Sequence, residues 1–202
     1  MASLILSSRI SAALSDFRSV VRAQKTGVEY EMLAYCYRLV GDIGRAVNFY
    51  GVAADISADK DEKARLGLNA AVLASTSKND MRDTWPLISK VIETDPTFAA
   101  PYHFRAKLLL QPNFSRDTST QLALSDIRMA LSVGPSNTML NFDAAHIFSL
   151  AAQKNSNDVE YETCARVQLT VAVDFGLPRD ALRQRWTKMW AKRSLVSGTS
   201  NS

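Results

Sequence analysis

Between residues 30 and 54, apolar residues recur at helical spacing on both sides of the pair Gly41-Asp42. These positions are Tyr30, Leu33, Ala34, Tyr37, Ala46, Tyr50, Ala53 and Ala54. Residues three and four apart share one face of an α-helix, so each run predicts an amphipathic helix. The Gly41-Asp42 pair between them predicts a tight turn. The stretch therefore predicts a helical hairpin, and further hairpins should follow because one hairpin cannot bury its own apolar face.

A separate apolar stripe precedes this hairpin. Its members are Leu6, Ile10, Leu14, Phe17, Val20 and Val21, mostly three or four residues apart. The stripe predicts a helix within residues 1–26 that has one face to bury, and we interpret it as an N-terminal cap. Two alternatives stay open at this point: the helix could be the second half of a degenerate repeat, or a dimer surface.

Three more hairpins are predicted downstream, because apolar residues recur at helical spacing in three further stretches. They span residues 61–96, 99–135 and 138–178. In the first of them, the second helix should begin near Asp83, since proline is tolerated in the first turn of a helix and Pro86 would then lie there. Polar insertions at residues 111–120 and 153–158 interrupt the other two. Together with the first hairpin, these stretches fill residues 27–178.

The pattern of the first hairpin resembles the tetratricopeptide repeat (TPR), a 34-residue helical hairpin with conserved spacings of aromatic and small residues. Tyr30 stands where the TPR signature has tryptophan, Ala34 and Ala46 stand at its small positions, and Tyr50 at its second aromatic position. This resemblance implies an all-α fold, a right-handed α-solenoid of about four TPR-like helical hairpins with N- and C-terminal capping helices. It also implies a repeat protein whose function is protein binding.

The TPR resemblance further implies a binding surface. In TPR proteins the first helix of each repeat lines a concave groove that holds a partner's peptide. Carried over by register, the groove positions are Glu31, Tyr35, Arg38, Asn69, His103, Lys107, Phe142, His146 and Ser149. We expect the two aromatic residues to offer apolar contact and the basic residues and histidines to donate to an acidic or polar ligand. Glu31 and Tyr35 occupy places where some TPR proteins clamp a partner's terminal carboxylate, so a chaperone-tail receptor is not expected.

The composition is that of an ordinary soluble protein, with 47% hydrophobic and 22% charged residues. No run approaches the roughly 18 apolar residues that a membrane-spanning helix needs. The apolar patch at residues 1–6 is too short for a secretory signal. We therefore expect a cytoplasmic protein.

The net charge of +4 is concentrated near the C-terminus. Residues 179–193 hold six of the basic residues and one acidic residue, a local charge of +5, so the rest of the chain sums to −1. The apolar residues here fall on one helical stripe: Leu182, Trp186, Met189 and Trp190. We interpret residues 179–193 as a basic capping helix and residues 194–202 as a disordered tail. As an alternative, this helix could bind a membrane surface or nucleic acid, although nucleic acid is not the expected partner.

Catalytic motifs are missing from the sequence. His103 and His146, the two histidines, have no partner at the spacing of a triad or a metal site, and the glycines form no phosphate-binding loop. Cys36 and Cys164 belong to no Cys-x-x-Cys pair and are expected to be buried thiols. We expect no enzyme, cofactor or metal, but a scaffold or adaptor that binds another protein or peptide. A regulatory module associated with a signalling enzyme is a further alternative, and the oligomeric state is open.

Overall fold

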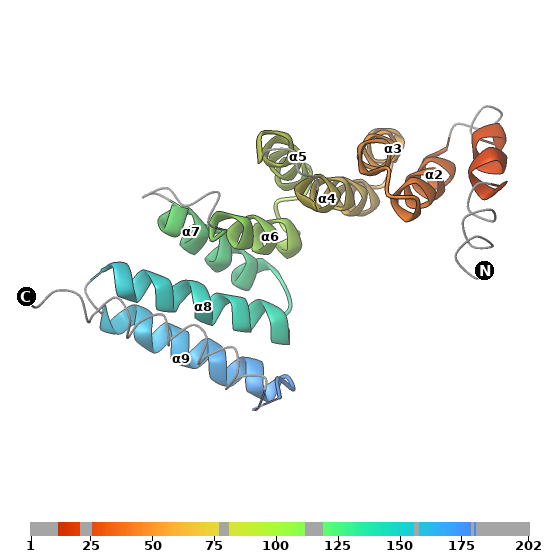
Figure 1. The fold of residues 1–202 in the computed structure, drawn as a ribbon. Coiled ribbons are helices and arrows are strands. Elements are labelled where there is room, and N and C mark those ends of the chain that lie inside the picture. The colour runs from red at the N-terminus through yellow and green to blue at the C-terminus, as the bar shows by residue number, and fades with distance from the viewer. Residues whose placement is uncertain are drawn as a thin grey trace, which may run out of the picture. The chain divides into compact units, whose positions relative to one another are not determined.

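The computed structural model describes residues 12–20, 26–76, 81–111, 119–155, 158–178 and 180. All the regular secondary structure in these residues is helical, which confirms the prediction of an all-α protein (Figure 1). The chain divides into two compact units, Met1–Arg105 and Ala106–Ser202, and each unit is described by itself.

The first unit consists of helices that follow one another in the chain. After a helix over residues 12–20 come α2 (Gly27–Leu39), α3 (Ile43–Ile56), α4 (Lys60–Thr76), α5 (Met81–Thr94) and the first part of α6 (Ala99–Leu109). Helix α3 packs against both α2 and α4, and α4 also packs against α5. Short connections between packed helices make neighbouring helices run in opposite directions.

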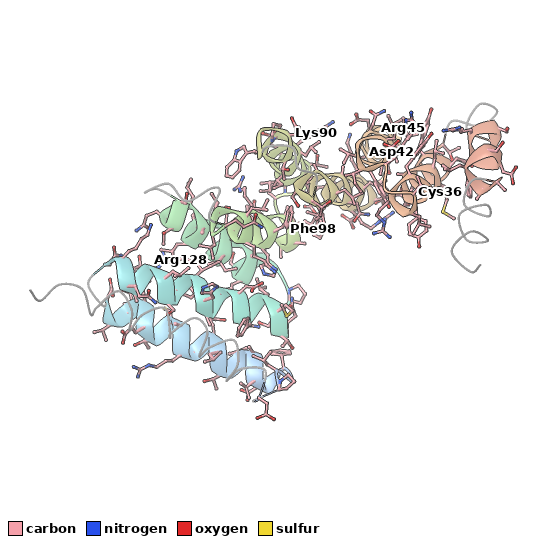
Figure 2. All side chains as sticks on the ribbon, in the orientation of Figure 1. Cys36, Asp42, Arg45, Lys90, Phe98 and Arg128 are labelled. Atoms are coloured by element: carbon pink, nitrogen blue, oxygen red, sulfur yellow. The ribbon has the colours of Figure 1, made fainter. Side chains whose placement is uncertain are left out.

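The turn between α2 and α3 lies where the sequence predicted it. Gly41 has a φ of +79°, a conformation that glycine adopts without steric cost. Asp42 caps α3, because its Oδ1 accepts a hydrogen bond of 3.1 Å from the backbone N–H of Arg45. The side chains of Asp42 and Arg45 lie side by side at this end of α3 (Figure 2). The pair Gly41-Asp42 therefore ends one helix and starts the next.

Small residues let the helices of the first unit approach closely. Ala34 and Ala53 are fully buried and pack in one cluster with Tyr50, Leu66 and Ala70. These alanines therefore lie where the helices meet, and their small side chains let the ridges of one helix fit the grooves of the other. Gly67 plays the same part between α4 and α5: a Cβ at this position would lie 2.8 Å from Cγ2 of Val91.

A second cluster ties the helix over residues 12–20 to the first hairpin. Leu14 packs there with Leu33, Tyr37 and Ala46. The rings of Tyr37 and Phe49 stack with their centroids 5.4 Å apart. Of the apolar stripe predicted near the N-terminus, Leu14 is buried and Phe17 packs against the same cluster, whereas Val20 is exposed. Leu6, Ile10 and Val21 lie outside the described residues.

Three ion pairs in the first unit join residues that lie 34 or 35 positions apart in the sequence. They are Glu31 with Arg65, Asp55 with Lys90, and Lys60 with Asp95. In the first two pairs the residues come from different helices, and in the third Lys60 of α4 pairs with Asp95, which directly follows α5. The separation in each pair is close to the length of one predicted hairpin. Residues about 34 positions apart in the sequence therefore lie next to each other at three places in this unit.

The predicted start of α5 was wrong by two residues. The helix begins at Met81 rather than near Asp83, so Pro86 is its sixth residue and lies within the helix. Pro86 is exposed, which gives its ring room, and its missing N–H removes one backbone hydrogen bond. Ile88 and Val91, which follow Pro86 on the same helix, are buried and stabilise it against its neighbours.

The second unit contains the end of α6, followed by α7 (Ser119–Val133), α8 (Thr138–Lys154) and α9 (Val159–Asp174). Helix α8 packs against both α7 and α9. Asn137 caps α8 by accepting a hydrogen bond from the N–H of Leu140, and Asp158 caps α9 through the N–H of Glu160. After α9, Gly176 has a φ of +93°, in keeping with the predicted stop before Pro178.

Several predictions concern residues at the margins of the described chain. Of residues 179–193, only Asp180 is described, so the basic capping helix and the tail after it lie outside the described residues.

Both cysteines are free thiols. Cys36 is buried, which raises its pKa, whereas Cys164 is half-buried. None of the described helices is long and apolar enough to span a membrane.

Candidate functional site

Glu31, the first predicted groove residue, holds α2 to α4. Its two carboxylate oxygens accept hydrogen bonds of 2.6 and 2.9 Å from Nη1 and Nη2 of Arg65. This two-point geometry matches the fork of the guanidinium to the carboxylate. Hydrogen bonding between the two side chains lowers the pKa of Glu31 and raises the pKa of Arg65. Glu62 also lies near Arg65, at 3.8 Å.

Tyr35 and Arg38 follow Glu31 on the same face of α2, one and two turns further on. The guanidinium carbon of Arg38 lies 4.9 Å from the centroid of the Tyr35 ring, a cation–π arrangement. Both side chains, with Glu31 and Arg65, act electrostatically on the buried hydroxyl of Tyr50, whose pKa is raised mainly by burial. The structure therefore brings the three predicted residues of the first hairpin together.

An exposed apolar stripe on α2 was missed by the sequence reasoning. Val28, Met32, Tyr35 and Leu39 are each between 43% and 60% exposed. Their spacings of four, three and four residues place them on one face of the helix. The spacing of these residues in the sequence already indicates a second apolar stripe. Of its members, only Tyr35 was predicted to belong to the groove.

Asn69 lies on α4, one turn after Arg65, and is half-buried. Val72, three residues later on the same helix, is partly exposed. Arg65 itself was missed, although it follows Glu31 by 34 residues and carries the opposite charge. A search for opposite charges one repeat apart would have found it.

The second unit gathers two other predicted residues around a residue that the sequence reasoning omitted. Nζ of Lys107, at the end of α6, lies 3.0 Å from Oδ2 of Asp143 on α8. His146 lies one turn after Asp143. Burial lowers the pKa of His146, and the negative charge of Asp143 acts in the opposite direction. His103, which belongs to the first unit, is half-buried.

Phe142 and Ser149 are buried in the second unit. Phe142 is 5% exposed and packs in a cluster with Ala172 and Leu177. Its expected role as an apolar contact for a partner is therefore at odds with its position in the core. The reason is that α8 packs against neighbours on two sides, so its register position alone does not bring it to the surface.

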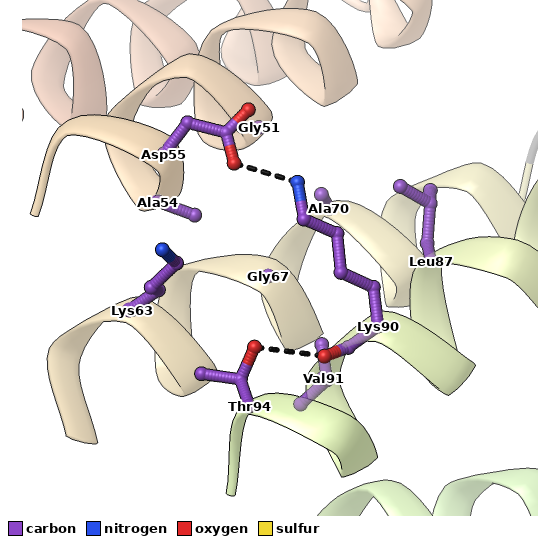
Figure 3. A pocket seen from close by; sticks show the side chains of 10 residues that line it. All are labelled: Gly51, Ala54, Asp55, Lys63, Gly67, Ala70, Leu87, Lys90, Val91 and Thr94. Atoms are coloured by element: carbon purple, nitrogen blue, oxygen red, sulfur yellow. Dashed lines mark hydrogen bonds and ion pairs between the residues drawn. The ribbon is translucent and has the colours of Figure 1, made fainter. Parts of the chain in front are cut away.

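A small cavity lies between α3, α4 and α5 (Figure 3). Lys63 and Thr94 line it, together with Lys90, whose Nζ lies 2.6 Å from Oδ1 of Asp55. Its volume is about 30 Å³. This is room for a water molecule but not for an organic ligand or cofactor.

Metal binding finds no support in the part of the chain that the structure describes, where no three histidine, cysteine, aspartate or glutamate side chains come together. No model of a known protein family matches this chain, and comparison with curated protein sequences found no match. The clearest candidate site is the exposed face of α2.

Proposed function

We propose that this chain is a TPR-like scaffold or adaptor, without catalytic activity, that binds a peptide of another protein. The observation that carries the proposal is the exposed apolar face of α2, formed by Val28, Met32, Tyr35 and Leu39. Contiguous exposed apolar patches on soluble proteins often serve as binding surfaces. Arg38 lies beside this face and adds a charged donor of the type that is frequent among binding hot spots.

The repeat architecture is part of the same proposal. It is supported by ion pairs that join positions about one hairpin apart, Glu31 with Arg65 in the first unit and Lys107 with Asp143 in the second. The packing of consecutive helices in each unit agrees with stacked hairpins. A right-handed α-solenoid formed from such hairpins would align the first helices within each unit along a groove.

Within this groove the residues have different tasks. Tyr35 offers apolar contact, and Arg38 donates hydrogen bonds to a carboxylate or carbonyl of the partner. Glu31 is already engaged by Arg65, so it positions α2 against α4 rather than meeting the ligand. In the second unit, Lys107 is likewise engaged by Asp143, and His146, one turn after Asp143, offers a polar contact. A cytoplasmic location belongs to this proposal.

An affinity capture from a lysate of the source cells tests the function. Wild type is compared with the double variant Tyr35→Ala, Arg38→Ala, and with Val159→Ala as a matched control. Val159 is 75% exposed, lies on α9 and is not one of the proposed groove positions. Circular dichroism first establishes that all three proteins are equally helical.

The proposal expects a protein that is retained by wild type and the control but lost by the double variant. Retention of the same proteins by all three would contradict it. Retention of nucleic acid alone, released by salt, would favour the basic C-terminal segment instead.

A further inference from the structure

The apolar residues on α2 form a narrow stripe. Val28, Met32, Tyr35 and Leu39 follow one another at intervals of four, three and four residues, the spacing of a seam between two packed helices. The stripe extends over three turns, roughly 16 Å along the helix axis. A second helix laid along α2 could therefore contact all four residues with one face of its own.

Both flanks of the stripe are closed by contacts within the first unit. On one side, Glu31 binds Arg65 of α4. On the other side, Cys36 is buried in the cluster that holds the helix over residues 12–20. The exposed face between these contacts is thus held on a rigid support, as a preformed docking surface requires.

The charge beside the stripe indicates what a partner should carry. Arg65 engages both Glu31 and Glu62. Among the described residues, Arg38 has no carboxylate partner, and its guanidinium lies over the ring of Tyr35. A partner's carboxylate next to the stripe would form an ion pair with Arg38, as Glu31 does with Arg65.

The size of the stripe argues against a second copy of the chain as the occupant. Four half-exposed side chains make a patch on the order of 300–400 Å², within the range that monomers expose. A stable interface between two proteins buries roughly 800 Å² on each partner. A single docked helix matches the patch better than a second folded chain does.

We infer that the α2 face binds an amphipathic helix of another protein. This helix carries apolar residues three and four positions apart, and an aspartate or glutamate that pairs with Arg38. The inference rests on the proposed function and specifies the conformation and charge of the bound segment.

Phage display of random 16-residue peptides against the immobilised full chain tests this inference. Selected peptides are synthesised with a fluorescent label, and their affinity is measured by anisotropy and their helicity by circular dichroism. The variants are Met32→Ser with Leu39→Ser, which removes the stripe, and Arg38→Glu, which reverses the charge. Val159→Ser with Val167→Ser, two exposed positions on α9, is the control.

We expect selected peptides with apolar residues at helical spacing and at least one acidic residue, and we expect them to become helical when bound. The stripe variant should weaken binding at least tenfold, and the control should change it less than twofold. Arg38→Glu should weaken the binding of acidic peptides. Replacing the acidic residue of the peptide by lysine should restore its binding to this variant.

Two results would overturn the inference and leave the proposed function standing. One is a set of peptides that bind through the α2 face in an extended form, without helical spacing. The other is binding that survives in the stripe variant but is lost in Lys107→Ala. If wild type selects no peptides above the uncoated surface, the inference and the proposed function both fail. A dimer in sedimentation that the stripe variant abolishes would assign the face to a second copy.

Discussion

Helices α2 and α8 hold equivalent positions in the predicted repeats, yet their environments differ. Helix α2 buries one face, with Leu33, Ala34, Cys36 and Tyr37, and exposes an apolar stripe on the other. Helix α8 buries most of its length, including the predicted groove residues Phe142 and Ser149. A helix that is apolar or small on all sides is typically enclosed by neighbours. Register thus identifies equivalent positions, but the composition around the helix decides which of them face solvent.

The largest expected effect contrasts the two aromatic residues that the sequence assigned to one groove. Phe142→Ala should lower the free energy of unfolding by about 3–5 kcal/mol, because it leaves a cavity in a packed cluster. Tyr35→Ala should lower it by less than about 1 kcal/mol, since this ring is partly exposed. Urea denaturation followed by circular dichroism measures both. Equal losses for the two variants would remove the distinction between α2 and α8.

A second prediction concerns Asp95, which pairs with Lys60 and accepts hydrogen bonds from the N–H and Oγ1 of Thr97. Asp95→Asn should destabilise the protein by roughly 1.5–3 kcal/mol, the range for hydrogen bonds to charged groups. The bond from Lys60 and those from Thr97 lower the pKa of Asp95 below its ordinary value of 3.8. Its stabilising effect is therefore complete above that value and is lost as the pH falls through the folded-state pKa.

The measurement is urea denaturation of wild type and Asp95→Asn at neutral and acid pH. The difference between them should shrink in acid. A difference that stays constant down to the lowest pH at which the protein folds would show that the charge of Asp95 does not contribute.

A third prediction concerns His146, which α8 holds in a largely buried place. Burial lowers its pKa below the ordinary value of 6.5, so the unfolded chain takes up a proton at this residue more readily than the folded chain does. Stability should therefore fall as the pH drops below 6.5. His146→Gln should reduce this part of the pH dependence, measured by thermal denaturation between pH 5 and 7. An unchanged pH profile in the variant would count against a buried neutral imidazole.

The smallest expected effect concerns the exposed ion pairs of the first unit. A double-mutant cycle on Glu31 and Arg65 should give a coupling of at most about 1 kcal/mol, because both side chains are partly solvated. The pair of Asp55 and Lys90 is more exposed and should give less. Added salt should reduce both values. A larger coupling for the second pair would contradict the ranking by exposure.

Helix positions followed from the sequence because helical spacing and caps are local properties. The turn at Gly41-Asp42 and the helix end at Gly176 require a positive φ, and glycine at these positions indicates that conformation. The start of α5 at Met81 was missed, since the tolerance of this helix for Pro86 depends on its exposure after packing.

The candidate site was only partly predictable. Glu31, Tyr35 and Arg38 come together because they share one helix face, which spacing determines. The roles of Arg65 and Asp143 depend on which helices become neighbours, and the burial of Phe142 depends on what covers α8. Such contacts join residues on different helices that lie far apart in the sequence, and periodicity within a single helix does not encode them.

Site-specific photo-crosslinking tests the central claim, that α2 presents the binding surface, most directly. A photoreactive phenylalanine analogue replaces Met32 on α2 in one protein and Val159 on α9 in another, and both are irradiated in a lysate of the source cells. We predict that the probe at position 32 links to a defined segment of one partner, while the probe at position 159 does not. The same crosslinks from both positions, or none from position 32, would contradict the account.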